Sequence, residues 1–329
     1  MNLFPPFPDL PDHSPATMQH VHALGHIDDT LAKKLDQAWG APDDWAACGW
    51  HWTQLDEVRA AINRKVTGDA ALSPLAWFFR VVGMAQALPL TRVLVLGCGA
   101  GRVEREVMQQ GWAREVVAID LSAKVLEVAR AEATGLHGIG YFQADMNCLP
   151  IGDGPFQPAA FDAVLGVSSV HHCAELECLY QRLGVLLRPG GFLFLDEYVG
   201  PDRFQWPDAQ LRHLNRLAGL LPTHMMSTLQ GEYRSCFRAP SVAEVIAVDP
   251  SEAVRSSDLL SLLGAYFVDV MVRPYGGAIL HLLLAHTAQN FVGEKAAPYL
   301  HSVMAAEDEL YRSGQLQHHF ACAIARRPG

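Results

Sequence analysis

The sequence lacks long uninterrupted apolar runs, and this absence limits where the protein is expected to act. No run of about 18 uncharged apolar residues occurs, so we expect no membrane-spanning helix and no membrane partner. Residues 1–15 contain five prolines but no basic segment followed by an apolar one, and we therefore expect no signal peptide. The 7 cysteines have no framework spacing, which favours free thiols and a cytoplasmic location.

Positive charge is also scarce in this chain. There are 25 lysines and arginines against 35 aspartates and glutamates, giving a net charge of −10. A nucleic-acid-binding surface needs a surplus of cations to contact phosphates, so nucleic acid is not an expected partner and a small-molecule substrate is. Hydrophobic residues make up 50% of the chain, which is ample for a large core. The oligomeric state is not readable from these features.

The most informative segment is residues 92–102, where an apolar run stops at a glycine-rich loop. Residues 93–96 are apolar without interruption, as in a strand buried on both faces. Gly97, Gly99 and Gly101 follow at every second position, which suits a backbone that approaches a ligand closely. A helical pattern comes next, so the order strand, loop, helix indicates a nucleotide-binding unit. The GxGxG spacing differs from the dinucleotide pattern GxGxxG, so nicotinamide and flavin cofactors fit less well.

Further strands follow at the spacing of successive strand–helix units. They lie within residues 115–120, 140–145, 161–168 and 186–195. This alternation indicates parallel strands with right-handed crossovers and helices on both faces of the sheet. Ligands in such sheets bind beyond the carboxyl ends of the strands. One crevice is therefore expected to collect Gly97, Asp120, Asp145, residues 168–172 and Glu197.

These motifs resemble those of the class I S-adenosylmethionine (SAM) methyltransferases. The glycine loop resembles the first motif of that family, and the acids that end the next two strands resemble its ribose and adenine contacts. The resemblance implies SAM as cofactor and S-adenosyl-L-homocysteine (SAH) as product. The cofactor-binding residues that it implies are Gly97, Cys98, Gly99, Gly101, Asp120, Leu121, Asp145, Met146 and Ser168. The alternative for Asp120, a helix cap or turn residue, is less favoured because Ser122 already supplies a good N-cap.

One position departs from the family pattern. Val95 stands two residues before the first glycine, where the family usually has an acid that helps to hold the methionine ammonium of SAM. The ammonium must then rely on the Gly97 carbonyl or on another group, for which Asp69 is a candidate. The competing interpretation is that Asp69 caps a helix or closes a turn after Gly68.

The resemblance also implies a fold and a division of the chain. We expect a Rossmann-like α/β fold with a doubly wound seven-stranded sheet, mostly parallel with one antiparallel strand. The expected parts are an N-terminal arm and helical cap (1–88), the SAM-binding core (89–200), a helical insertion (201–264) and the last part of the core (265–329). Strands six and seven are expected at 265–272 and 319–326, and the helices of residues 18–88 over the SAM pocket. Four tryptophans, Trp39, Trp45, Trp50 and Trp52, fit packing between these helices better than a substrate platform.

Methyl transfer needs an aligned nucleophile and, where that nucleophile carries a proton, a base. His171 and His172 follow the fourth strand, which faces the methyl group in this fold, and histidine titrates near neutrality. A structural role, bonding loop carbonyls, is the alternative for this pair. Glu197 is the next catalytic candidate, and the candidate substrate contacts are Tyr198, Arg203, Gln205 and Trp206.

We expect no metal site from sequence spacing. His20, His22 and His26 lie close together, but no cysteine or carboxylate near them is spaced to complete a tetrahedral set. Cys173 and Cys178 have a spacing that is poor for zinc.

The predicted function is methyl transfer from SAM to a small molecule, a sugar or secondary metabolite, at an oxygen, nitrogen or carbon atom. Residues 196–206, 251–256 and 273–277 resemble bacterial methyltransferases of small-molecule and polysaccharide biosynthesis. The main alternative is an enzyme of the same fold that binds SAM but catalyses a cyclisation or decarboxylation. A NAD-dependent oxidoreductase is opposed by the glycine spacing, and a non-catalytic interaction protein is the last alternative.

Overall fold

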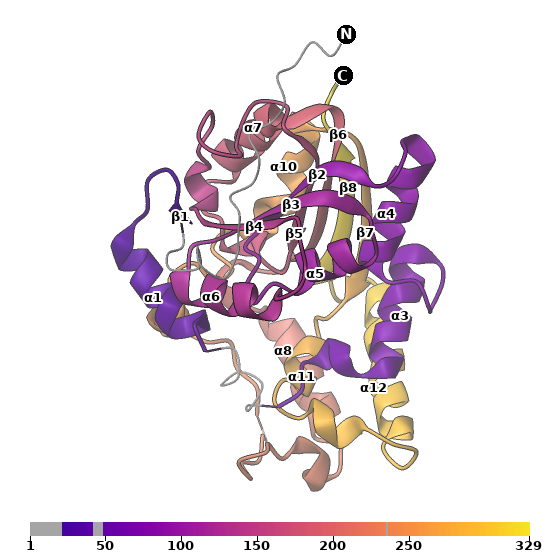
Figure 1. Ribbon diagram of the computed structural model, residues 1–329. Helices are drawn as coiled ribbons and strands as arrows, with labels where there is room; N and C mark the ends of the chain where they lie inside the picture. Colours follow the sequence, from indigo (N-terminus) through magenta and orange to yellow (C-terminus); the bar gives the residue numbers. More distant parts are fainter. Residues whose placement is uncertain (1–21, 42–48, 235) are drawn as a thin grey trace.

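The computed structural model describes residues 22–41, 49–234 and 236–329; His20 and Trp45 lie outside these ranges. An eight-stranded sheet at the centre has the strand order β1-β4-β3-β2-β5-β6-β8-β7 (Figure 1). Its strands are β1 (His22–Ala23), β2 (Leu90–Leu96), β3 (Ala113–Asp120), β4 (Ile139–Gln143), β5 (Phe161–Val167), β6 (Leu187–Tyr198), β7 (Val268–Gly276) and β8 (Phe320–Arg326).

The sheet is mostly parallel, as the sequence predicted. β8 runs antiparallel to both of its neighbours, β6 and β7, and the other pairings are parallel. The seven predicted strands are all present, and the two-residue β1 adds a short eighth by pairing with β4. The predicted Rossmann-like α/β fold is therefore confirmed.

The expected limits of the sixth strand need correction. Residues 265–266 belong to the end of helix α10 (Leu259–Tyr266), and β7 continues past residue 272 to Gly276. Pro274 does not stop the strand, because β7 lies at the edge of the sheet and needs hydrogen bonds on one side only.

Helices α1, α4, α6 and α9 begin at residues whose side chains accept hydrogen bonds from backbone amides of the first turn. Ser122 accepts a hydrogen bond from the Val125 amide at the start of its helix, and Ser241 and Glu244 form the expected capping box. Besides α10, the helices are α1 (Asp29–Trp39), α3 (Asp56–Thr67), α4 (Pro74–Ala85), α5 (Arg102–Gln109), α6 (Ala123–Glu132), α7 (Leu176–Leu186), α8 (Asp208–Ala218), α9 (Val242–Val248), α11 (Leu280–Leu284) and α12 (Ala297–Arg312). Within the described residues, no helix has the length and hydropathy needed to span a bilayer.

The sheet separates two hydrophobic cores, which explains the uninterrupted apolar run of β2. Val93 and Val95 face the core that α4 and α5 cover, with Phe78 and Phe79 from α4 packed there. Leu94 and Leu96 face the opposite core, which α7 and α10 cover. Burial on both faces leaves the strand ends as the accessible part of the sheet.

The helices that precede β2 lie in two places. α1 packs beside α6, whereas α4 contacts β6 and α3 contacts β7 on the other side of the molecule (Figure 1). The apolar face of α4, with Leu75, Phe78 and Val82 buried, accounts for its position against the sheet. Of the described helices that were expected over the pocket, α1, α3 and α4, only α1 therefore lies there.

Candidate cofactor and active site

A cavity of about 300 Å³ lies where β2, β3, β4 and β5 end, with α1 on its outer side. Seven of the nine predicted cofactor residues line it, namely Gly97, Gly99, Asp120, Leu121, Asp145, Met146 and Ser168. Leu31, Leu35 and Trp39 of α1 complete the wall. The other two predicted residues lie beside this lining: Cys98 is buried among core side chains, and Gly101 is the N-cap of α5.

The glycine loop brings the backbone close to the loop that follows β5. Gly97 has φ +54°, and a Cβ atom there would lie 2.6 Å from Cβ of Ser169. The Ser169 hydroxyl donates to the Leu96 carbonyl at 2.7 Å, which holds the two loops together. Ser168 itself has φ +52°, a conformation that non-glycine residues adopt rarely and that clusters at functional sites.

Asp120 connects the first two strand ends. Its carboxylate accepts a hydrogen bond from the Gly99 amide at 3.0 Å and another from the Ser122 amide at 2.9 Å. Burial raises the pKa of this carboxyl group. Asp120 thus makes the contacts expected of a turn residue, which was the alternative interpretation from the sequence, and it also borders the cavity.

Asp145 ends the next strand and is fixed in the same way. Its Oδ1 atom accepts from the backbone and side-chain nitrogens of Asn147, each at 2.8 Å. The side-chain Oδ1 atom of Asn147 in turn accepts from the backbone amides of Ala174 and Glu175. This chain of contacts sets the two carboxylates on the cavity wall at the ends of neighbouring strands.

The cavity fits an adenosyl group in chemical terms. Gly99 has φ +53° and no atom within 4 Å of the position that a Cβ would take, so the loop leaves a cradle there. Asp120 and Asp145 offer acceptors for hydroxyl and amino donors, while Ile119, Val125 and Ala144 supply an apolar surface.

Asp69 does not replace the acid that the resemblance leads one to expect at the position of Val95. Val95 is buried in the core, as expected of a strand residue. The Asp69 carboxylate accepts from the Ala71 amide at 2.9 Å, within the turn after Gly68, and Asp69 does not line the cavity. The turn interpretation of Asp69 therefore holds.

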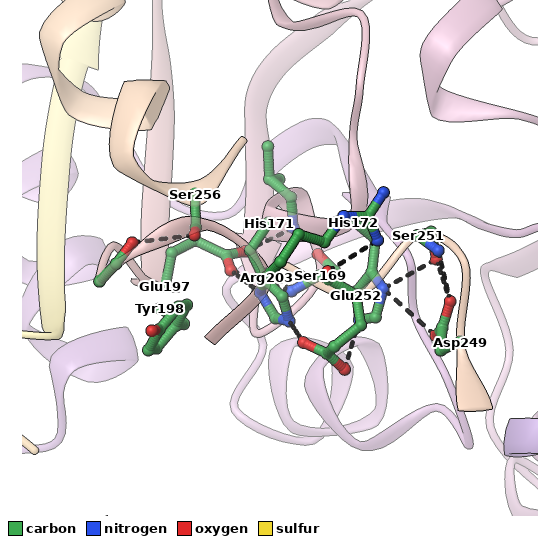
Figure 2. A network of polar contacts seen from close by, with 12 residues as sticks. Ser169, His171, His172, Glu197, Tyr198, Arg203, Asp249, Ser251, Glu252 and Ser256 are labelled. Atoms are coloured by element: carbon green, nitrogen blue, oxygen red, sulfur yellow. Dashed lines mark hydrogen bonds and ion pairs between the residues drawn. The ribbon is translucent and has the colours of Figure 1, made fainter. Parts of the chain in front are cut away.

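The two histidines lie in the 3₁₀ turn Val170–His172 that follows β5, at one end of the cavity (Figure 2). His171 is buried, and its Nδ1 lies 2.7 Å from Oε2 of Glu197, which ends β6. Glu197 also accepts from the amides of Ser169 and Val170. His172 lines the cavity, and its Nδ1 lies 3.0 Å from the Ser251 hydroxyl.

The two rings have opposite pKa shifts. Burial alone would lower the pKa of His171, but the hydrogen bond and charge of Glu197, aided by Glu252 and Asp249, raise it above its usual value. Burial, together with the charge of His171, lowers the pKa of His172 to about 4. The His172 imidazole is therefore neutral at pH 7.

Residues 249–252 form part of the site, although the sequence assigned them no role. Asp249 accepts from the Trp39 indole nitrogen at 2.7 Å and from the Ser251 hydroxyl at 2.6 Å. Arg203 donates to the carbonyls of Pro250 and Glu252, which holds the segment against the histidines. The resemblance of residues 251–256 to a methyltransferase subgroup was the only sequence signal here.

The four predicted substrate contacts lie at the end of β6 and in the residues that follow it, and none of them lines the cavity. Arg203 is occupied by the backbone carbonyls already described. Tyr198 donates to the Pro201 carbonyl, Gln205 donates to the carbonyls of Arg203 and Pro240, and Trp206 stacks on Phe204.

The tryptophans divide into three environments. Trp52 is buried and packs against Tyr275 and Phe320, in agreement with core packing. Trp50 is 45% exposed. Trp39 instead lines the cavity and meets the His172 ring edge-on at 5.8 Å, so the core-packing prediction is wrong for this residue.

Comparisons with known proteins agree with this geometry. Residues 93–191 match the family model described as "Methyltransferase domain". The ubiquinone biosynthesis O-methyltransferase of Xanthomonas campestris pv. campestris (strain B100) is 34% identical over 152 residues, covering 44% of this chain and 61% of the relative. The malonyl-[acyl-carrier protein] O-methyltransferase of Enterobacter lignolyticus (strain SCF1) is 39% identical over 102 residues. The match covers 31% of this chain and 37% of that relative.

Among solved structures, Haemonchus contortus phosphoethanolamine N-methyltransferase 2 in complex with SAM has a TM-score of 0.50 and 14% identity. The match covers 91% of this chain and 60% of that one, and it shows the fold alone. The chain spans 61% of the length of the first curated relatives that it matches. The match to the methyltransferase-domain model over residues 93–191 agrees with the resemblance to the class I SAM methyltransferases that the sequence motifs indicated. The solved structure that shares the fold holds SAM, which is the cofactor that the sequence predicted for this chain.

Proposed function

We propose that the protein transfers the methyl group of SAM to an oxygen atom of a small-molecule acceptor. The observation that carries the proposal is the cavity at the strand ends, which joins the glycine loop, Asp120 and Asp145 within the methyltransferase domain. The oxygen acceptor is supported by the two curated relatives described above, both of which are O-methyltransferases.

SAM supplies an electrophilic methyl group on a sulfonium, so the protein has mainly to bind, orient and exclude water. In this proposal the glycine loop holds the methionine part, Asp120 accepts the ribose hydroxyls, and Asp145 with Met146 contacts the adenine. Leu31 and Leu35 of α1 cover the cavity with apolar side chains, which keeps water away from the cofactor.

The acceptor would bind at the histidine end of the cavity. His172 borders it there and is neutral, whereas Glu197 is occupied by two backbone amides and by His171. We therefore assign Glu197 a positioning role and place the groups that manage the acceptor proton at the histidine pair. Of the four predicted substrate contacts, Arg203 supports the segment opposite these rings and Tyr198 lies against the His171 ring.

The protein is proposed to work in the reducing cytoplasm without nucleic-acid or membrane partners. The six cysteines in the described part of the chain are all free thiols, which agrees with that setting. The net charge of −10 argues against phosphate-rich partners.

Two measurements test the proposal. Isothermal titration calorimetry with SAM and SAH should give micromolar dissociation constants, and the absence of binding to either would refute it. Methyl-labelled SAM, incubated with the protein and panels of phenols, sugars and carboxylic acids or a bacterial extract, should transfer label to an acceptor. Binding without any transfer of label would favour the cyclisation or decarboxylation alternative instead.

A further inference from the structure

Two segments that are far apart in the sequence bring three metal-ligating side chains together beside the SAM cavity (Figure 2). His171 and His172 come from the 3₁₀ turn after β5, and Glu252 comes from the segment after α9. One donor atom of each lies within 4.8 Å of the donor atoms of the other two. Oε1 of Glu252 lies 3.5 Å from Nε2 of His171, and its Oε2 lies 4.0 Å from Nε2 of His172.

The other nitrogen of each imidazole is held by an oxygen acceptor. Nδ1 of His171 faces Glu197 at 2.7 Å, while Nδ1 of His172 faces Ser251 at 3.0 Å and Asp249 at 3.5 Å. These contacts favour the proton on Nδ1 and leave the Nε2 lone pairs directed toward Glu252. Metal-binding histidines show this arrangement, in which the nitrogen that does not ligate donates to a carboxylate or another oxygen.

We propose that His171, His172 and Glu252 bind a divalent first-row transition-metal ion. Two imidazoles and one carboxylate are a donor set typical of zinc and of non-haem iron, with further coordination positions left open. Ligand bonds of about 2.0–2.2 Å place neighbouring donors roughly 3–3.6 Å apart. Donor atoms that lie up to 4.8 Å apart therefore have to approach one another by about 1–2 Å to hold the ion. The side chains are 10%, 18% and 16% exposed, which leaves the cluster accessible.

The charge around the cluster favours a cation. Glu197, Asp249 and Glu252 surround the two imidazoles, and Arg203 is the neighbouring cation in the network of Figure 2. Metal ligation requires both imidazoles to be in the neutral form. In that form three carboxylates and one guanidinium leave two negative charges uncompensated, and a divalent ion cancels them. A simple ion pair would require one histidine, whereas here both rings are directed at the same carboxylate.

The consequence for catalysis rests on the proposed methyl transfer. Because His172 borders the cavity, the ion would lie at the acceptor end of the site. An acceptor hydroxyl bound at an open position would lose its proton to water more easily, since a bound divalent ion lowers the pKa of coordinated oxygen. The oxygen–methyl bond then forms as the sulfonium–methyl bond breaks, leaving SAH as a neutral thioether.

The test is metal binding by the full chain after treatment with a chelator. Titration with Co²⁺, followed by visible absorption, and with Zn²⁺, followed by calorimetry, should show one saturable site. Glu252→Gln and His172→Asn should each weaken the affinity at least tenfold. Glu232→Gln and His137→Asn, which change exposed residues of the same kinds, should leave it unchanged. Circular dichroism of each variant establishes that it is folded.

The absence of saturable binding, or equal affinity in the site variants and the controls, would overturn the proposal. Calorimetry with SAH on the chelated protein tests the cofactor site separately, so a failure of SAM binding is distinguishable from a failure of metal binding. Full label transfer by chelated protein, with metal-binding titrations still positive, would retain the site and reject its role in acceptor activation.

Discussion

Glu197 and His171 form a buried pair in which the carboxylate of β6 lies 2.7 Å from Nδ1 of the ring that follows β5. The same carboxylate accepts from the amides of Ser169 and Val170, so one side chain at the end of β6 fixes the whole loop after the neighbouring strand. That loop carries both histidines and packs against the glycine loop, which makes Glu197 a structural centre of the proposed acceptor end.

Glu197→Gln should destabilise the protein. One carboxylate oxygen becomes an NH₂ group that faces buried donors, so we expect the free energy of unfolding to fall by about 2–3 kcal/mol. Urea denaturation measures this change. Glu127→Gln, at an exposed position on α6, should change it by less than about 0.5 kcal/mol. Equal stability of the two variants would show that the buried pair is not a structural centre.

Gly97→Ala should lower the free energy of unfolding by more than its positive φ alone explains. Gly97 and Gly111 have φ of +54° and +65°, but a Cβ at Gly111 would meet no atom within 4 Å. Gly111→Ala therefore reports the conformational cost, about 1–2 kcal/mol. Gly97→Ala should lower the free energy of unfolding by about 1–3 kcal/mol more than this, because its Cβ meets Ser169. The same substitution should also weaken SAH binding. Thermal and urea denaturation compare the pair, and equal losses would argue against the close approach of the two loops.

Asp120→Asn should weaken SAH binding at least tenfold, about 1.4 kcal/mol. The substitution removes the charge that the ribose hydroxyls are proposed to contact and disturbs the acceptor of the Gly99 amide. Calorimetry with SAH gives the dissociation constant. Asp153→Asn, at an exposed loop position, should bind SAH like the unaltered protein. An unchanged constant in Asp120→Asn would remove this residue from the cofactor site.

Trp39→Ala should weaken SAH binding about tenfold because α1 would lose both a cavity wall and its hydrogen bond to Asp249. Trp39→Phe keeps most of the apolar contact, so its affinity for SAH should lie between those of Trp39→Ala and the unaltered protein. Trp50→Ala, which removes a tryptophan that is 45% exposed, is the matched control for calorimetry. If all three variants bind SAH equally, α1 does not cover the cofactor.

Glu104 should make stability depend on pH. This residue is fully buried on α5, and burial raises its pKa to about 7. Between the ordinary value near 4.5 and pH 7 the folded protein holds a proton that the unfolded chain releases, so stability falls as the pH rises through this range, by about 3 kcal/mol.

Glu104→Gln should therefore be more stable than the original protein at pH 8, and the difference should shrink at pH 5. Urea denaturation at both pH values measures it, with exposed Glu132→Gln as the control. A stability difference that is the same at pH 5 and pH 8 would contradict the raised pKa.

Much of the core could be predicted because its signals are local. The apolar run before Gly97 and the capping group Ser122 act over a few neighbouring residues, and the observed strands and helices follow them within a few positions. The limits of β7 were harder to predict, because apolar residues at the end of α10 fit a strand pattern equally well.

The acceptor end could not be predicted in the same way. Trp39 reaches Asp249 across 210 residues, and His172 reaches Ser251 across 79. No periodicity or spacing relates such positions, so the sequence analysis treated Trp39 as core packing and gave residues 249–252 no part in the site.

The sequence by itself determined the fold class, the cofactor and the carboxylates at the strand ends, because apolar periodicity, glycine spacing and terminal acids are properties of short segments. Only the tertiary structure decided what surrounds the cofactor. Parallel strands with crossovers bring distant loops to one edge of the sheet, and the contacts of Arg203 with the backbone of residues 250 and 252 set Glu252 opposite the two histidines. That placement depends on packing across the whole chain.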